Sequence, residues 1–298
     1  MPMKAPPPSR PAAFKRARLL IVGCGDVGLR VARQAPHWRR FALTSDAARA
    51  PALRAAGLTP IVGNLDAPAT LRRLAALAPL VLHLAPPPSS GRDDPRTRAL
   101  LQALSRSAVV QRLVYASTTG VYGDAAGARF DETRAVNPGN ERAHRRVSAE
   151  QAVRRFGRHR TASLLRIPGI YGRDREGGHP RERLARGTPV LAADDDVYTN
   201  HIQADDLARV CMAALLHGRP QRVYHASDDT ELKMGDYFDL AADLCGLPRP
   251  ERVPRAAAAH RMSPLQLSFM SESRRLVNRR MKDELRVVLR YPTVRDGL

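Results

Sequence analysis

Short runs of apolar residues and longer stretches of helical periodicity follow one another along this 298-residue chain. The apolar runs, which are typical of parallel strands covered on both faces, lie at 19–22, 41–44, 61–63, 80–84 and 112–117. Between them, apolar residues recur every three or four positions, as at Val27, Val31 and Ala35 and at Leu71, Leu74 and Leu77. Strands that alternate with helices at this spacing predict an α/β fold with a doubly wound parallel sheet.

A glycine-rich turn follows the first apolar run directly. Segment 23–28 reads Gly-Cys-Gly-Asp-Val-Gly, which matches Gly-x-Gly-x-x-Gly. The first glycine permits the tight turn, the second lets a pyrophosphate approach the backbone, and the third lets the next helix pack close to the strand. A sharp turn without a ligand is the alternative, but the preceding strand and the following helix favour a dinucleotide-binding Rossmann domain. The predicted cofactor contacts in this turn are Gly23, Gly25, Asp26, Val27 and Gly28.

The end of the second apolar run bears on which dinucleotide fits. Thr44 is followed by Ser45 and Asp46, with Arg49 just beyond. An acidic residue at this strand end binds the ribose diol of NAD, whereas hydroxyl groups and arginine accept the 2′-phosphate of NADP. Because Asp46 lies slightly late for the first role, Ser45 and Arg49 favour NADP, with NAD as the alternative.

Two further loops at strand ends are candidates for contact with the two halves of the cofactor. Asn64 and Leu65 follow the third run and are predicted to frame the adenine, and Ala85 and Pro86 follow the fourth and are predicted to lie on the nicotinamide side. The simpler interpretations are a turn asparagine and a proline-rich loop that no helix crosses. Ligands of open parallel sheets bind beyond the carboxyl ends of the strands, which is where both pairs lie.

Four later segments form an ordered series. They are 115–124, a hydroxyl-rich strand end that continues into Val-Tyr-Gly; 166–172, which ends in Ile-Tyr-Gly; 200–208, which contains His-Ile-Gln-Ala-Asp-Asp; and 223–227. The series resembles the extended short-chain dehydrogenase/reductase superfamily, of the NAD-dependent epimerase and dehydratase type. The resemblance extends from about residue 18 to the end. It implies a nucleotide-binding domain over 18–172, to which 201–227 return, and a smaller substrate-binding lobe formed mainly by 173–298.

The chain departs from that superfamily on one helix. Members generally carry Tyr-x-x-x-Lys after the fifth strand, where the lysine lowers the pKa of the phenol for proton transfer. Counting back from Glu150, Arg142 stands at the tyrosine position and Arg146 at the lysine position. Arginine keeps its proton, so Arg142 cannot act as the acid/base, whereas Arg146 can still donate to the nicotinamide ribose. The chain therefore resembles the atypical members that lack the pair.

The resemblance also implies the other site residues. Thr118 aligns with the catalytic serine of the superfamily and is expected to orient the reacting oxygen, and Tyr122 is a second hydroxyl near it. A structural role is the alternative for Tyr122, because proton transfer requires suitable geometry first. Ser117 and Pro168 are expected against the cofactor. Arg142 and Arg146 complete the catalytic candidates as anchors for the cofactor or for an anionic substrate.

Composition narrows the classes of protein and partner. The formal net charge is +20, but only four of the 49 basic residues are lysines. The arginines are spread along the chain and form no basic stripe interleaved with aromatic residues, so no dedicated nucleic-acid surface is predicted. Three scattered cysteines indicate neither a disulfide framework nor a metal site. No apolar run reaches the roughly 20 residues that span a membrane. We expect a cytoplasmic protein with a disordered, proline-rich tail over 1–17.

Together these patterns predict an NAD(P)-dependent oxidoreductase or epimerase/dehydratase-like enzyme. Its substrate is expected to be a small polar molecule, anionic or a sugar nucleotide, and a homodimer is the candidate assembly. A catalytically silent NAD(P)-binding redox sensor or partner regulator is the alternative, because one fold serves both functions.

Overall fold

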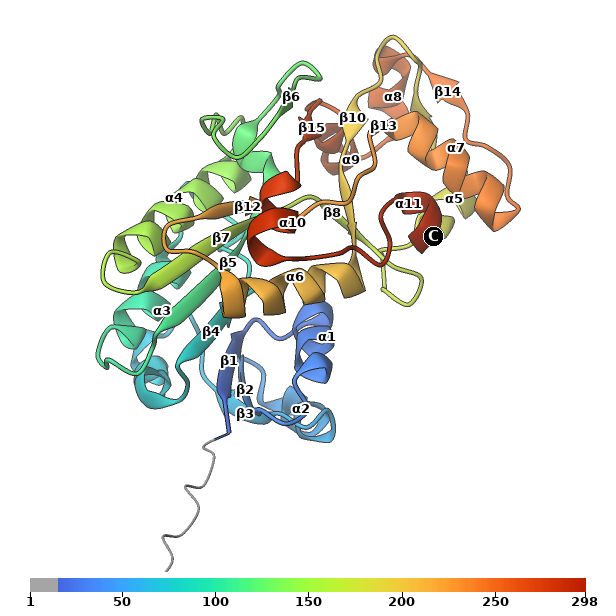
Figure 1. Ribbon diagram of the computed structural model, residues 1–298. Helices are drawn as coiled ribbons and strands as arrows, with labels where there is room; N and C mark the ends of the chain where they lie inside the picture. Colours follow the sequence, from blue (N-terminus) through green and yellow to red (C-terminus); the bar gives the residue numbers. More distant parts are fainter. Residues whose placement is uncertain (1–15) are drawn as a thin grey trace, which may run out of the picture.

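A computed structural model describes residues 16–298 of the chain (Figure 1). All but the last two residues of the predicted tail over 1–17 lie outside the described residues. The central feature is a seven-stranded sheet in which every neighbouring pair is parallel. Its strands are β1 (Arg18–Val22), β2 (Arg39–Thr44), β3 (Thr59–Val62), β4 (Leu80–His83), β5 (Arg112–Thr118), β7 (Thr161–Ile167) and β12 (Val223–His225).

The strand order is β12-β7-β5-β4-β1-β2-β3, so the direction in which strands are added reverses between β1 and β4. Such a reversal opens a crevice at the carboxyl ends of the strands, where open parallel sheets bind their ligands. The predicted α/β fold with a doubly wound sheet is confirmed.

Helices cover both faces of this sheet (Figure 1). The α-helices are α1 (Asp26–Gln34), α2 (Ala50–Ala55), α3 (Pro95–Leu104), α4 (Glu141–Phe156), α5 (Arg181–Ala185), α6 (Ala204–His217), α7 (Met234–Cys245), α8 (Arg255–Arg261), α9 (Pro264–Phe269), α10 (Arg279–Leu285) and α11 (Val294–Gly297). Three 3-10 helices are η1 (Ala47–Arg49), η2 (Pro68–Ala76) and η3 (Thr119–Tyr122). The stretch with Leu71, Leu74 and Leu77 thus folds mainly as the 3-10 helix η2, with Pro68 in its first turn.

The side chains of β1 alternate between two hydrophobic layers. Leu19 and Ile21 pack in the layer shared with α1, α6 and α10, and Leu20 and Val22 pack in the layer shared with η2, α3 and α4. All four side chains are 0 or 1% exposed. Because both faces of the strand are covered, its sequence is a continuous apolar run rather than an alternating one.

The chain beyond β7 builds a second, smaller lobe at the carboxyl edge of the sheet (Figure 1). Short strand pairs support it: β8 (Gly169–Tyr171) with β11 (His201–Gln203), β9 (Val190–Leu191) with β14 (Arg252–Val253), β10 (Tyr198–Thr199) with β13 (Leu232–Lys233), and β6 (Arg129–Phe130) with β15 (Arg275–Leu276). Helices α5, α7, α8 and α9 pack on two small cores of their own. Between these parts of the lobe, α6 and β12 return to the central sheet, so the lobe is tied to the crevice at several points.

Candidate functional site

A groove of about 320 Å³ lies at the reversal of strand order. Its walls come from the turn after β1 and from the carboxyl ends of β4, β5 and β7. Nine of the predicted site residues line it, and eight of these are Gly23, Gly25, Asp26, Val27, Gly28, Ser117, Thr118 and Pro168. Arg146 lines it as well. Tertiary structure therefore brings together residues that stand up to 145 positions apart in the sequence.

The three glycines of the turn have three different surroundings. A β-carbon on Gly23, whose φ is +81°, would lie 2.4 Å from the backbone nitrogen of Ala85, and one on Gly28 would lie 3.2 Å from the Ile21 side chain. A β-carbon on Gly25 would meet no protein atom within 4 Å. Packing therefore requires glycine at 23 and leaves little room for a larger residue at 28, whereas the space beside Gly25 is open to a ligand, as a dinucleotide pyrophosphate needs.

The first turn of α1 is free to bind an anion. Gly25 is its N-cap residue and has no side chain to accept from the first amides. The N–H groups at this end of a helix lack intrahelical partners and carry the positive end of the helix dipole. The residues present therefore fit a dinucleotide at this groove.

Charged side chains surround the start of α1. Asp26 Oδ1 accepts from Nε of Arg30 at 3.0 Å, and Asp26 Oδ2 accepts from Nη1 of Arg175 at 2.7 Å. Arg30, which is 4% exposed, also donates to Asp174 and Asp205. Burial lowers the pKa of Arg30, but these hydrogen bonds raise it by more, so the guanidinium stays charged. The pair of Asp26 and Arg30 is local, but the contacts to Asp174, Arg175 and Asp205 were not predictable because those residues lie far along the chain.

The other predicted cofactor residues lie around the groove without lining it. Arg49 Nη2 donates to the carbonyl oxygen of Cys24 at 2.9 Å, so η1 brings this arginine against the glycine-rich turn. Ser45 is exposed, while Asp46 is occupied as the N-cap of η1 and accepts from the Ala48 amide. Burial raises the pKa of the Cys24 thiol to about 11, although Arg49 lowers it, so no thiolate forms there near neutral pH.

The loop pairs after β3 and β4 have mainly structural contacts in the described structure. The Asn64 side chain accepts from the Asp66 amide, as in a turn, and Leu65 packs partly buried against the core beneath η2. Ala85 is buried under Gly23, and Pro86 is exposed. The roles predicted for these residues at the adenine and the nicotinamide stay predictions.

A second and larger cavity, of about 530 Å³, adjoins the groove. The two share Thr118, Pro168, Ile170 and Arg175. Its remaining walls come from the start of α4 and from the smaller lobe. Four arginines line it, Arg142, Arg175, Arg183 and Arg274, against one carboxylate, Glu272.

Thr118 occupies the junction of the two cavities. Its partly exposed side chain accepts a hydrogen bond of 3.3 Å from the Gly120 amide. The preceding Ser117 is buried and donates to Glu150 at 2.6 Å. Glu150 is itself held by Arg166 in a buried ion pair of 2.7 Å. The end of β5 is thereby fixed to α4 and β7, and of its two hydroxyls only that of Thr118 is free to meet a substrate.

The two arginines at the positions of the missing pair lie in different cavities. Arg146 lines the groove and donates to the Ala116 carbonyl at 2.7 Å and to the Tyr115 hydroxyl at 3.1 Å. Arg142 lines the larger cavity, exposed, with its guanidinium 4.8 Å from the ring centre of Phe269. The roles predicted for the two arginines, as anchors for the cofactor or for an anionic substrate, stay predictions.

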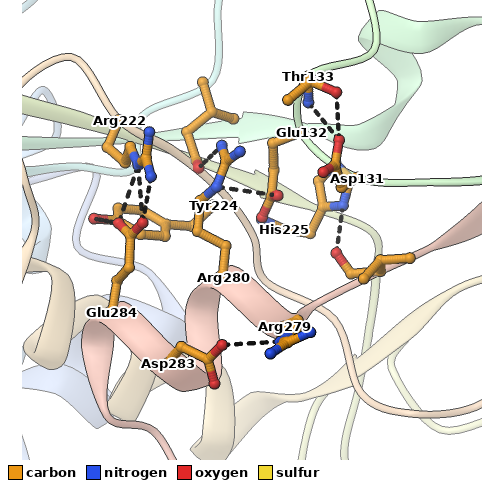
Figure 2. A network of polar contacts seen from close by, with 12 residues as sticks. Asp131, Glu132, Thr133, Arg222, Tyr224, His225, Arg279, Arg280, Asp283 and Glu284 are labelled. Carbon is orange, nitrogen blue, oxygen red and sulfur yellow. Dashed lines mark hydrogen bonds and ion pairs between the residues drawn. The ribbon is translucent and has the colours of Figure 1, made fainter.

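Tyr122 lies in the core and lines neither cavity. Its hydroxyl is 2.6 Å from Nε2 of His225, whose Nδ1 is 3.0 Å from the Val277 carbonyl. Figure 2 shows how His225 is held: its amide donates to Glu132, which also pairs with Arg280. These contacts favour the structural role for Tyr122, and its part in a reaction stays a prediction.

Several residues of the larger cavity were missed by sequence reasoning. Arg183 is partly buried, and burial lowers its pKa to about 10. His201 stacks on Tyr237 with ring centres 4.2 Å apart, and burial lowers the pKa of His201 to about 3, so it is neutral. The only signals in the sequence were the arginine-rich segment after 172 and the histidine of 200–208, and neither indicates which way a side chain points.

Two features are absent from the described residues. Within residues 16–298 no three histidine, cysteine, aspartate or glutamate side chains are grouped so that they could hold a metal ion. None of the helices described has both the length and the apolar character needed to cross a membrane.

The fold defines the class of protein: a Rossmann-type α/β domain with a second, smaller lobe, as in extended short-chain dehydrogenases/reductases. The family model described as the RmlD substrate binding domain matches residues 99–290. The chain belongs to this family of NAD-dependent epimerase and dehydratase relatives, which confirms the resemblance. None of the curated proteins matches it in sequence.

Solved structures agree along nearly the whole chain. A functionally unknown conserved protein from Silicibacter pomeroyi is 30% identical, with a TM-score of 0.80 over 94% of this chain and 96% of that one. A dTDP-glucose 4,6-dehydratase from Streptomyces venezuelae, solved with NAD bound, is 21% identical with a TM-score of 0.75 over 94% of each chain. A UDP-glucuronic acid 4-epimerase from Bacillus cereus in complex with NAD is 15% identical, with a TM-score of 0.74 over 94% of this chain and 95% of that one. The last two comparisons support the fold alone.

Proposed function

We propose that this protein is an NAD(P)-dependent enzyme of oxidoreductase or epimerase type that acts on an anionic substrate. The observation that carries the proposal is the junction at Thr118, where the groove beside the glycine-rich turn meets the arginine-lined cavity. A cofactor in the first and a substrate in the second would have their reacting ends next to one hydroxyl. Such an arrangement supports chemistry between them rather than cofactor storage.

The charge of the larger cavity indicates the substrate class. Apart from Arg175, which also borders the groove, it is lined by Arg142, Arg183 and Arg274 and by a single carboxylate, Glu272. Guanidinium groups match the oxygens of phosphate and carboxylate. Sugar nucleotides, which the dehydratase and epimerase compared above act on by name, are therefore the first substrates to test.

In such a reaction each of the residues at the two cavities would have a separate role. A bound nicotinamide accepts or donates hydride at its C4 atom. Thr118 orients the reacting oxygen of the substrate, Arg146 donates to the ribose, and Arg142 holds the anionic group. Neither arginine takes up the hydroxyl proton that oxidation releases, because both keep their own protons, so this proton would pass to another group or to water. We further propose NADP as the preferred form, because Arg49 lies against the glycine-rich turn.

A substrate screen tests this function. Purified protein is incubated with sugar nucleotides, keto acids and quinones and with each nicotinamide cofactor, and the absorbance of the reduced nicotinamide is followed. Because an epimerase regenerates its cofactor, each sugar nucleotide is also checked for isomers by chromatography. Turnover of an anionic substrate supports the proposal. Tight cofactor binding without any turnover, together with a cofactor-dependent change in association with a partner protein, would instead identify a redox sensor.

A further inference from the structure

The Asp26 carboxylate stands at the place where a bound dinucleotide brings negative charge. Asp26 is the first residue of α1 and lines the groove beside Gly25. Arg30 cannot neutralise it alone, since the same guanidinium also serves Asp174 and Asp205. Without another cation the start of α1 would carry an excess of negative charge toward the pyrophosphate.

Arg175 supplies that cation from a distant part of the chain. It lies in the loop between β8 and α5, and its Nη1 donates to Asp26 Oδ2 at 2.7 Å across 149 residues of sequence. The loop is shaped around this side chain: a β-carbon on Gly178 would lie 2.5 Å from Arg175 Cδ and 2.6 Å from its Cγ. The amide of Gly178 also donates to the Arg175 carbonyl at 3.0 Å. The conformation of the loop, with glycine at 178, thus fixes the position of the Arg175 side chain.

The Arg175 guanidinium has N–H groups that donate to no protein group within the described residues. Its Nε is buried without a partner, and within residues 16–298 its Nη1 alone has a hydrogen bond. Arg175 is one of the four residues that line both the groove and the larger cavity. The Arg175 side chain therefore forms part of the groove wall beside the glycine-rich turn, and its Nη2 has no hydrogen bond within the described residues.

We propose that Arg175 is a positioning residue for the cofactor, whose guanidinium bridges the Asp26 carboxylate and the pyrophosphate of the bound dinucleotide. The bridge has two effects. It neutralises the Asp26 carboxylate beside the bound phosphates, and it connects the loop over residues 173–178 to the dinucleotide. The inference concerns binding of the cofactor and not the reaction, so it stands or falls separately from the choice of substrate.

Binding measurements test the bridge. Dissociation constants for NADPH, NADH and ADP-ribose are measured by titration calorimetry for the wild type, Arg175→Ala and the charge-matched control Arg186→Ala, an exposed arginine that lines neither cavity. Arg175→Ala is expected to weaken all three ligands by a similar factor of about ten or more, as for loss of a charge-assisted hydrogen bond. Arg186→Ala is expected to change them less than twofold.

Two further variants separate the bridge from a general loss of structure. Asp26→Asn in the Arg175→Ala background is expected to restore part of the affinity, because it removes the carboxylate that the arginine had neutralised. Gly178→Ala keeps every charge but displaces the Arg175 stem, and it is expected to weaken ADP-ribose without lowering the melting temperature by more than a few degrees.

Three results would overturn the inference. They are an unchanged dissociation constant in Arg175→Ala, weakening of NADPH and NADH while ADP-ribose binds normally, and no recovery on adding Asp26→Asn. If the wild type binds no dinucleotide at all, the proposed function falls together with it. Wild-type binding with an unaffected Arg175→Ala removes this inference alone.

Discussion

The hydroxyl of Tyr122 lies 2.6 Å from Nε2 of His225, and both side chains are fully buried. Burial raises the pKa of Tyr122 to about 12, although Arg166 opposes the shift, and burial lowers the pKa of His225 to about 3. Both groups are therefore neutral near pH 7 and closed off from the cavities. This pair joins η3 to β12 and leaves Thr118 as the hydroxyl at the cavity junction.

Replacing each hydroxyl should separate structure from reaction. Tyr122→Phe is expected to lower the free energy of unfolding by about 1 to 3 kcal/mol, because it leaves the buried His225 nitrogen without a partner, and to leave turnover nearly unchanged. Thr118→Ala is expected to lower kcat with little effect on stability. Urea unfolding and steady-state kinetics on any substrate found by the screen measure the two effects. Full activity in Thr118→Ala would remove Thr118 from the proposed site.

Arg142→Ala should act through substrate binding. Its guanidinium is exposed at the larger cavity and has no proton to exchange, so the variant is expected to raise KM with little change in kcat. Loss of an acid/base group would instead lower kcat by about 10² to 10⁴. Kinetics over a wide substrate range distinguish the two, and a change in kcat alone would contradict the anchoring role.

Two glycines of the same turn should respond differently to substitution. Gly25→Val is expected to abolish dinucleotide binding with the melting temperature nearly preserved, because the new side chain enters open space in the groove. Gly23→Ala is expected to destabilise the fold, since its φ of +81° is strained for alanine and the β-carbon meets Ala85. Calorimetry and thermal melts of both variants check this. Normal cofactor affinity in Gly25→Val would contradict the assignment of the groove.

Cofactor preference should depend on Arg49. If Ser45 and Arg49 contact a 2′-phosphate, NADPH binds more tightly than NADH, and Arg49→Ala removes the difference. The preference should shrink as salt concentration rises, because exposed charges are screened. Titrations at low and high ionic strength measure it. Equal affinities at low salt would leave Asp46 and the ribose diol of NAD as the alternative.

Asp228 should make stability fall with rising pH. Burial raises its pKa to about 7 from 3.8, and its Oδ2 has no hydrogen-bond partner in the described structure. Between about pH 4 and 7 the folded protein holds a proton that the unfolded chain has released, so the native state loses up to about 4 kcal/mol across this range.

Asp228→Asn isolates this contribution. The amide oxygen can keep the hydrogen bond that Oδ1 accepts from the Thr230 amide at 3.0 Å. The variant is therefore expected to melt higher than the wild type at pH 8 and at nearly the same temperature at pH 4. A difference that does not change with pH would show that Asp228 ionises normally in the folded state.

Much of the site was predictable because it is local in sequence. The turn at 23–28 and the end of β5 each combine a strand, its terminus and the following helix in one stretch, so their residue types indicate their place in the fold. The roles of Tyr122 and Arg175 were not predictable in this way. Each depends on a contact more than 100 residues away in the chain, to His225 and to Asp26.

By itself the sequence determined the α/β class, the order of the strands along the chain and the position of the glycine-rich turn, because hydrophobic period and backbone freedom are properties of neighbouring residues. Tertiary structure alone decided which hydroxyl lines a cavity, which arginines line the larger cavity and which carboxylate meets Arg175. Those outcomes depend on the direction of each side chain and on its burial, and both are set only when β7, α6 and the smaller lobe close around the carboxyl edge of the sheet.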